Sequence, residues 1–191
     1  MGLSVASWKK VVILAFVKSR RHHWGSDALA FINTYEHSID SKNRLAVPSE
    51  VRRLLEWNRE TPESPVTLYV TLGDDQSLCI YEKKPFEDRA RQLQNSDMDP
   101  DELVRCERLL FSLTTKVDLD PQGRIRIPDH LMRLAKLGND VVIIGCNDHM
   151  EVRDRKTWLS YVEQSVADDP KLWSKLRRAM RQGSPQRGTE A

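Results

Sequence analysis

The chain has 191 residues, of which 39% are hydrophobic and 30% charged, an ordinary composition for a water-soluble globular protein. The formal net charge of +2 hides an asymmetry, because residues 1–30 and 175–191 each carry five basic residues against one acidic residue. The remaining 144-residue body, 31–174, is therefore mildly acidic. This excludes nucleic-acid binding through bulk charge, so any such contact must come from a local patch.

Residues 1–30 are predicted to be a disordered extension rather than an export signal. Their apolar run, Val11–Val17, is short for a signal peptide, and the basic block 18–23 that follows would oppose export. The run is also too short to span a bilayer. We therefore expect a cytoplasmic protein with no membrane partner.

An internal repeat organises the rest of the chain. At an offset of 80 positions, Thr34–Leu55 aligns with Thr114–Ala135 and six of the 22 positions are identical. Farther along, the offset falls to 72 and pairs Gly73 with Gly145, because the first copy has a longer polar loop at 59–65. The chain therefore contains two copies of one module.

Both copies are predicted to have the same order of elements, in which period-two apolar alternation marks strands and a proline opens a short helix. In the first copy we expect strands at 34–39, 44–47, 66–70 and 78–81, with helices after Pro48 and at 86–93. In the second copy we expect strands at 114–119, 124–127, 141–144 and 150–152, with helices after Pro128 and at 157–166.

Each short helix is predicted to bury one apolar stripe. The stripes are Val51, Leu54 and Leu55 in the first copy and Leu131, Leu134 and Ala135 in the second. Gly138 is placed to end the second helix. The predicted organisation is a disordered extension (1–30), repeat 1 (31–97), a linking helix (98–113), repeat 2 (114–170), and a basic helix with a disordered tail (171–191).

A turn with a D-x-x-x-R pattern follows the first strand of each copy, as Asp40–Arg44 and as Asp120–Arg124. Asn43 and Gly123 occupy equivalent positions within these turns, and both residue types tolerate a positive φ. Asp40 and Asp120 are predicted to organise the turns by accepting backbone N–H groups and holding the following arginine. An alternative is that each Asp/Arg pair is merely a turn-stabilising ion pair.

This doubled pattern, with its matched flanks and intervening helix, resembles the MraZ family over residues 31–174. The resemblance implies an α+β fold of two tandem, pseudo-symmetric AbrB/SpoVT-like swapped-hairpin β-units with short helices. It also implies a nucleoid-associated transcriptional regulator that assembles into a ring-shaped homo-oligomer. Its partner would be double-stranded DNA, at short G-containing repeats in the promoter of the division and cell-wall gene cluster. Asn43 departs from the glycine that is usual in the family.

The resemblance and the turn chemistry together suggest a DNA site. A two-stranded ribbon fits the major groove, and a guanidinium can donate two hydrogen bonds to guanine, so Arg44 and Arg124 are the candidates for base reading. Lys42 and Arg126 are candidates for phosphate contacts. Gln122, the counterpart of Lys42, could bond to a base edge or a phosphate but carries no charge, so the two copies should contribute unequally.

Other function classes have weaker support. The sequence contains no nucleophile elbow, phosphate loop or zinc-protease motif, so we expect neither catalysis nor a small-molecule substrate. Cys79, Cys106 and Cys146 lie far apart, and His22 and His23 stand in a basic run, so we expect no disulfide framework, metal site or cofactor. The alternative that stays open is a protein-binding module, antitoxin-like or a ring scaffold, because the fold does not fix the function.

Overall fold

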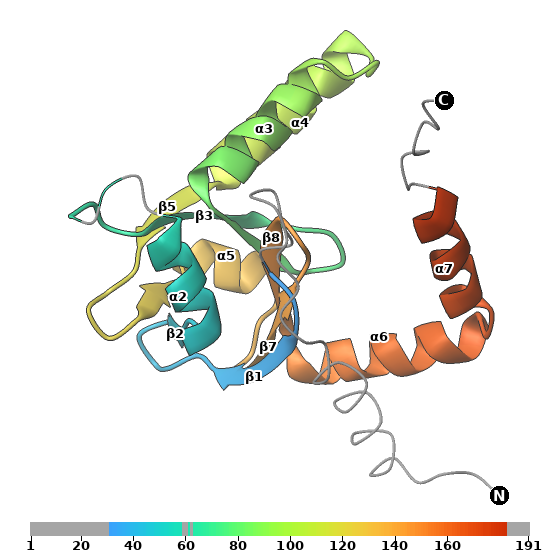
Figure 1. Ribbon diagram of the computed structural model, residues 1–191. Helices are drawn as coiled ribbons and strands as arrows, with labels where there is room; N and C mark the ends of the chain where they lie inside the picture. The colour runs from blue at the N-terminus through green and yellow to red at the C-terminus, as the bar shows by residue number, and fades with distance from the viewer. Residues whose placement is uncertain (1–30, 59–60, 62, 183–191) are drawn as a thin grey trace, which may run out of the picture.

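The computed structural model describes residues 31–58, 61 and 63–182 (Figure 1). The predicted N-terminal extension (1–30) and the tail from Gly183 lie outside the described residues. The elements of the first copy are β1 (Thr34–Ser38), β2 (Arg44–Ala46), α2 (Ser49–Trp57), β3 (Thr67–Leu72), β4 (Leu78–Tyr81) and α3 (Lys83–Gln94). Those that follow are α4 (Pro100–Leu113), β5 (Thr115–Asp118), β6 (Arg124–Arg126), α5 (Asp129–Leu134), β7 (Asp140–Gly145), β8 (His149–Asp154), α6 (Arg155–Asp168) and α7 (Leu172–Gln182).

The two copies are interleaved in one six-stranded antiparallel sheet, whose strand order is β1-β7-β8-β4-β3-β5. The first strand of each copy pairs with the third strand of the other copy. Thus β1 runs beside β7, with Thr34 opposite Ile144, and β5 runs beside β3, with Val117 opposite Leu68. The central pair, β4 and β8, also joins the copies. This exchange of strands confirms the predicted tandem swapped-hairpin fold.

The strands β2 and β6 form a separate two-stranded ribbon. Leu45 and Ile125 are directly opposite each other in this ribbon, and both side chains are buried. Burying a side chain of this size stabilises the fold by about 1.5–3 kcal/mol. The inner face of the ribbon is thereby fixed to the core, and the other face is left for arginine side chains.

The short helices α2 and α5 begin directly after Pro48 and Pro128. Val51, Leu55, Leu131 and Ala135 are buried as predicted, but Leu134 is 49% exposed, so its place in the apolar stripe was predicted wrongly. Leu134 lies about 60° around the helix from Leu131, on the flank of the stripe.

The predicted role of Gly138 in ending α5 is also wrong. The helix ends at Leu134, and Lys136 takes the left-handed conformation with φ of 50°. Lys136 N donates to Arg133 O and Leu137 N donates to Met132 O, which is the Schellman arrangement with lysine at the position that glycine usually holds. Leu137 then packs against the core.

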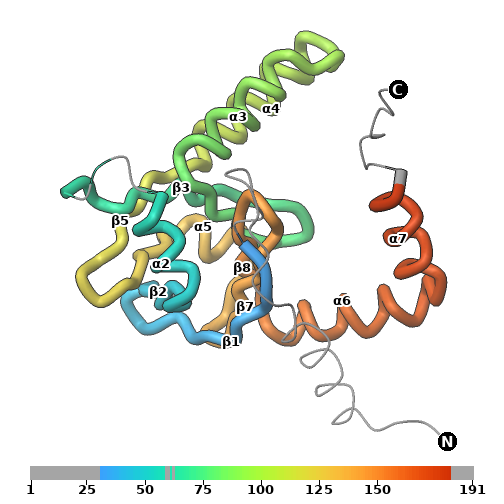
Figure 2. Tube along the Cα trace, in the orientation of Figure 1, coloured from blue at the N-terminus to red at the C-terminus, as the bar shows by residue number. Residues whose placement is uncertain are grey.

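Two helical arms extend from the body (Figures 1 and 2). The arm formed by α3 and α4 is anchored by Phe86, whose ring stacks on Tyr69 at a centroid distance of 4.8 Å. The arm formed by α6 and α7 leaves the body after β8. Within the part of the chain that the structure describes, no helix combines the length and the apolar character needed to cross a bilayer.

Candidate nucleic-acid interface

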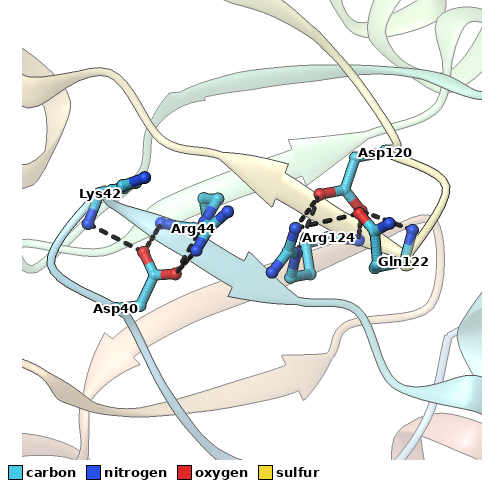
Figure 3. A network of polar contacts seen from close by, with 6 residues as sticks. All are labelled: Asp40, Lys42, Arg44, Asp120, Gln122 and Arg124. Carbon is cyan, nitrogen blue, oxygen red and sulfur yellow. Dashed lines mark hydrogen bonds and ion pairs between the residues drawn. The ribbon is translucent and has the colours of Figure 1, made fainter.

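The first D-x-x-x-R turn is organised by the carboxylate of Asp40 (Figure 3). Asp40 Oδ1 accepts hydrogen bonds from the backbone N–H groups of Lys42 and Arg44, both at 2.9 Å. Asp40 Oδ2 accepts from Arg44 Nε at 2.7 Å and lies 2.6 Å from Arg44 Nη2. One carboxylate therefore fixes both the backbone of the turn and the direction of the arginine.

The second turn repeats this arrangement. Asp120 Oδ1 accepts from the backbone N–H groups of Gln122 and Arg124, and Oδ2 accepts from Arg124 Nε, each at 2.9 Å. Arg124 Nη2 lies 2.8 Å from Asp120 Oδ2 and also donates to Gln122 Oε1 at 3.0 Å (Figure 3). The side chain of Gln122 thus contacts the arginine of its turn. Figure 3 draws no corresponding contact between the side chains of Lys42 and Arg44.

Both turns need a residue in the left-handed region just before the arginine. Asn43 has φ of 57° and Gly123 has φ of 76°. This conformation allows Asn43 N to donate to Asp40 O and Gly123 N to donate to Asp120 O, which closes each turn. Asparagine and glycine are the residue types that reach the region at low cost.

Each turn packs against the short helix of the other copy. Asn43 Nδ2 donates to Asp129 Oδ1, at the start of α5, at 2.6 Å. Gly123 lies beneath the side chain of Arg52 in α2, so closely that a Cβ at position 123 would overlap Arg52. Asp129 and Arg52 could not be predicted from the sequence, because both contacts cross between the copies and no local motif marks them.

The ribbon brings three arginines onto one face. In the β2–β6 pairing, Arg44 is opposite Arg126 and Ala46 is opposite Arg124, while Leu45 and Ile125 point to the core. Residues directly opposite each other in an antiparallel pair point to the same side, and side chains alternate along each strand. Arg44, Arg124 and Arg126 therefore share the outer face of the ribbon, with Ala46 leaving space between them.

The surroundings of the two arginines determine which of their donors are available. A guanidinium has five N–H donors, and in both turns Nε and one proton of Nη2 are directed at the aspartate. Among the described residues, nothing bonds to Nη1 or to the second proton of Nη2 in Arg44, and these donors together form an end-on fork. In Arg124 that second proton is directed at Gln122, so within the same part of the chain Nη1 alone is left.

The ion pairs also affect the carboxylates. Hydrogen bonds from Arg44 lower the pKa of Asp40 from 3.8 to about 2. At Asp120, partial burial acts against the shift, but the hydrogen bonds from Arg124 still lower the pKa below its usual value. Both aspartates therefore stay ionised at neutral pH. Both arginine side chains remain accessible, with 33% of Arg44 and 28% of Arg124 exposed.

The structure thus brings together all nine residues that the sequence analysis singled out. Lys42, Gln122 and Arg126 are exposed around the ribbon, while Gly123 is buried beneath Arg52. Lys42, Arg44, Arg124 and Arg126 give four positive charges against the two carboxylates of Asp40 and Asp120. The result is a small cationic surface on a body that is otherwise acidic, which we call the arginine ribbon.

These features define the class of the protein as a tandem swapped-hairpin protein, with the arginine ribbon at the crossing of its two copies. Comparison with known proteins identifies the family. The family described as "MraZ protein, putative antitoxin-like" matches residues 30–104 and 110–177. The chain belongs to the MraZ family.

Curated relatives cover most of the chain and carry one name, transcriptional regulator MraZ. The Roseiflexus castenholzii protein is 35% identical over 146 residues, which are 76% of this chain and 96% of the relative. The Ureaplasma urealyticum protein is 38% identical over 64% of this chain and 79% of the relative. The Mycoplasma mycoides protein is 31% identical over 70% of this chain and 93% of the relative. Transcriptional regulators are not a class of enzyme.

Proposed function

We propose that this protein is a sequence-specific transcriptional regulator that binds double-stranded DNA through the arginine ribbon. Its targets would be short G-containing promoter repeats, bound by a ring-shaped homo-oligomer on the nucleoid, upstream of the division and cell-wall genes. The placement of Arg44, Arg124 and Arg126 on one accessible face of a two-stranded ribbon carries this proposal. The shared name of the curated relatives supports the regulatory part of it.

The chemistry of the ribbon suits the major groove. That groove admits a two-stranded ribbon, and guanine presents O6 and N7 there as adjacent acceptors for an arginine. Arg44, with its end-on fork, is assigned to guanine, and Arg124 to a single acceptor through Nη1. Lys42 and Arg126 are assigned to phosphates, which position the protein without reading sequence.

Repetition would supply the affinity that one ribbon lacks. A few phosphate contacts give weak binding, whereas linked copies that engage spaced repeats gain through effective concentration. The helical arms expose apolar residues suited to contacts between chains, namely Leu109 and Phe111 of α4 and Leu159, Tyr161, Val162 and Val166 of α6. Heterologous contacts of such surfaces close into rings when the rotation between subunits permits.

The decisive experiment is a fluorescence-anisotropy titration of the region upstream of the protein's own operon at low ionic strength. The Arg44→Ala/Arg124→Ala double variant should lose sequence-specific binding, while light scattering shows an unchanged oligomer. Arg108→Ala, an exposed arginine of α4, is the matched control and should bind normally. If the assembled wild-type protein does not bind this DNA, the proposal is overturned. Full binding by the double variant would remove the site assignment.

A second candidate is a protein-binding module of the same fold. The antitoxin-like wording of the family description and the exposed apolar residues of the arms favour it. The same titration separates the two, because a protein-binding module would show no preference for promoter DNA. Substitution of Phe111 and Tyr161 would then abolish partner binding, while Arg44→Ala and Arg124→Ala would leave it intact.

A further inference from the structure

The two central strands of the sheet bring three potential metal ligands together, away from the arginine ribbon. Cys79 of β4 is directly opposite Glu151 of β8, and His149 is two residues from Glu151 on the same side of the strand. The Sγ atom of Cys79, a ring nitrogen of His149 and a carboxylate oxygen of Glu151 all lie within 4.8 Å of one another. Spacing along the sequence gave no sign of this group, because it forms across strands from the two copies.

The position of the His149 imidazole is fixed by contacts of its Nδ1 atom and its ring face. Its Nδ1 lies 2.9 Å from Asp148 Oδ1. The carboxylate of Asp148 also accepts two hydrogen bonds from Arg89, of 3.0 and 3.1 Å. The ring stacks on Tyr81 at a centroid distance of 4.8 Å. Nε2 is therefore left to face Glu151 Oε1, 3.7 Å away. Histidines that bind metals characteristically have their other nitrogen bonded to a carboxylate in this way.

Glu151 divides its two oxygens between separate partners. Oε2 accepts a hydrogen bond from Arg153 Nε at 2.8 Å, so Oε1 is the oxygen that faces His149. Cys146 lies close to the same carboxylate. His149 and Glu151 retain 11% and 20% of side-chain exposure, so an ion can reach the group from solvent.

The carboxylates around the imidazole favour a cation at this position. Asp148 Oδ1 and Glu151 Oε1 lie 2.9 and 3.7 Å from the two ring nitrogens of His149. A metal ion placed between these ligands would displace protons from them on binding.

We propose that Cys79, His149 and Glu151 form a binding site for a divalent transition-metal ion, and that Zn²⁺ is the ion this donor set fits. Sulfur, imidazole nitrogen and carboxylate oxygen are the three donor types that zinc accepts in proteins. Tetrahedral zinc needs ligand atoms about 3.5 Å apart, so the donors must close in by about 1 Å. The ion would link β4 of the first copy to β8 of the second. The ion would bind here whether or not the arginine ribbon binds DNA.

The full-length protein, stripped of metal with a chelator, provides the test. Titration with Co²⁺ should give the visible absorption of a tetrahedral ion and a thiolate-to-metal charge-transfer band, saturating at one ion per chain and displaced by Zn²⁺. Cys106→Ser, the third free cysteine of the described chain, is the matched control and should leave the spectrum unchanged. Cys79→Ser should remove the charge-transfer band, and Asp148→Asn should weaken binding about tenfold.

Thermal unfolding keeps the test informative if Cys79→Ser does not fold. Zn²⁺ should raise the melting temperature of the wild type and of Cys106→Ser, because a ligand that binds only the folded state stabilises it. It should not raise that of His149→Gln. The proposal is overturned if the wild-type protein gives no Co²⁺ spectrum and no zinc-dependent rise, or if His149→Gln retains both.

Discussion

The two D-x-x-x-R turns share one backbone and one carboxylate cap, but their surroundings differ. In the first turn, Asn43 is tied to Asp129, and among the described residues only Asp40 bonds to the guanidinium of Arg44. In the second, Gly123 lies beneath Arg52, and Gln122 takes one further donor of Arg124. Duplication therefore preserved the scaffold of the turn, while the donors that face outward were allowed to diverge.

This difference separates two roles that a single motif could otherwise combine. The Asp–Arg hydrogen bonds are common to both turns and orient each guanidinium. The residue two positions before the arginine decides how many donors the guanidinium still offers and whether a positive charge stands beside it. We therefore expect the first turn to dominate base reading and phosphate attraction, and the second to be more sensitive to changes in its backbone.

The largest expected effect is on DNA discrimination by the first arginine. Arg44→Ala should reduce affinity for the promoter repeat by roughly five- to 150-fold, the equivalent of about 1–3 kcal/mol for a guanine contact, and Arg124→Ala should reduce it less. Anisotropy with 7-deazaguanine DNA tests the assignment, because loss of N7 should weaken the wild type and not Arg44→Ala. Equal effects of the two substitutions would contradict the asymmetry.

The next effect concerns stability, and here the second turn should be the more sensitive. Gly123→Ala places a Cβ in the left-handed region and against Arg52, so we expect the free energy of unfolding to fall by about 2 kcal/mol. Asn43→Gly relieves its own backbone but loses the bond to Asp129, for a net change below about 1 kcal/mol. Urea unfolding of both variants would show this order, and a reversed order would refute it.

A smaller effect should appear in the salt dependence of DNA binding. Lys42→Gln makes the first turn resemble the second, and Gln122→Lys makes the second resemble the first. The slope of log affinity against log salt should become shallower by about 0.9 for each phosphate that Lys42→Gln no longer neutralises. It should become steeper by a similar amount for each phosphate that Gln122→Lys newly neutralises. Lys42→Gln should also weaken the preference for guanine, because a glutamine at this position would take one donor of Arg44, as Gln122 takes one of Arg124. If both slopes match the wild type, neither position binds phosphate.

The smallest effect is a pH dependence from Asp40. Because its pKa falls from 3.8 to about 2 on folding, its ion pair contributes stability above about pH 4 and loses that contribution as the pH falls towards 2. The melting temperature of the wild type should thus exceed that of Asp40→Asn near pH 5, and the two should converge near pH 2. A difference that is constant over this range would exclude the ion pair as its source.

Most of the architecture could be predicted from the sequence, because each element of the module is indicated by the same residue pattern in both copies. Apolar alternation and the prolines placed the strands and short helices of both copies, and the doubled Asp and Arg positions located the turns. Capping of the linking helix also has a local signal, since Asp99 accepts from the backbone N–H groups of Asp101 and Glu102. Features that depend on residues within one short segment could therefore be predicted from the sequence.

Features that depend on contacts between the copies could not be predicted from the sequence. The bond from Asn43 to Asp129 joins residues 86 positions apart, and the packing of Arg52 over Gly123 has no pattern in either segment alone. The grouping of Cys79 with His149 arises from the pairing of β4 with β8. The Schellman end of α5 could not be predicted, because the position that glycine usually takes is occupied by Lys136.

The pairing of β1 with β7 has a consequence for folding during synthesis on the ribosome. Thr34 finds its partner only when Ile144 has been made, so the first strand must wait for nearly the whole domain to be translated. Contacts so remote in sequence slow folding, and an unpaired strand edge invites association with other nascent chains. Neither repeat can therefore mature ahead of the other, and a chain released early would be left with an open edge.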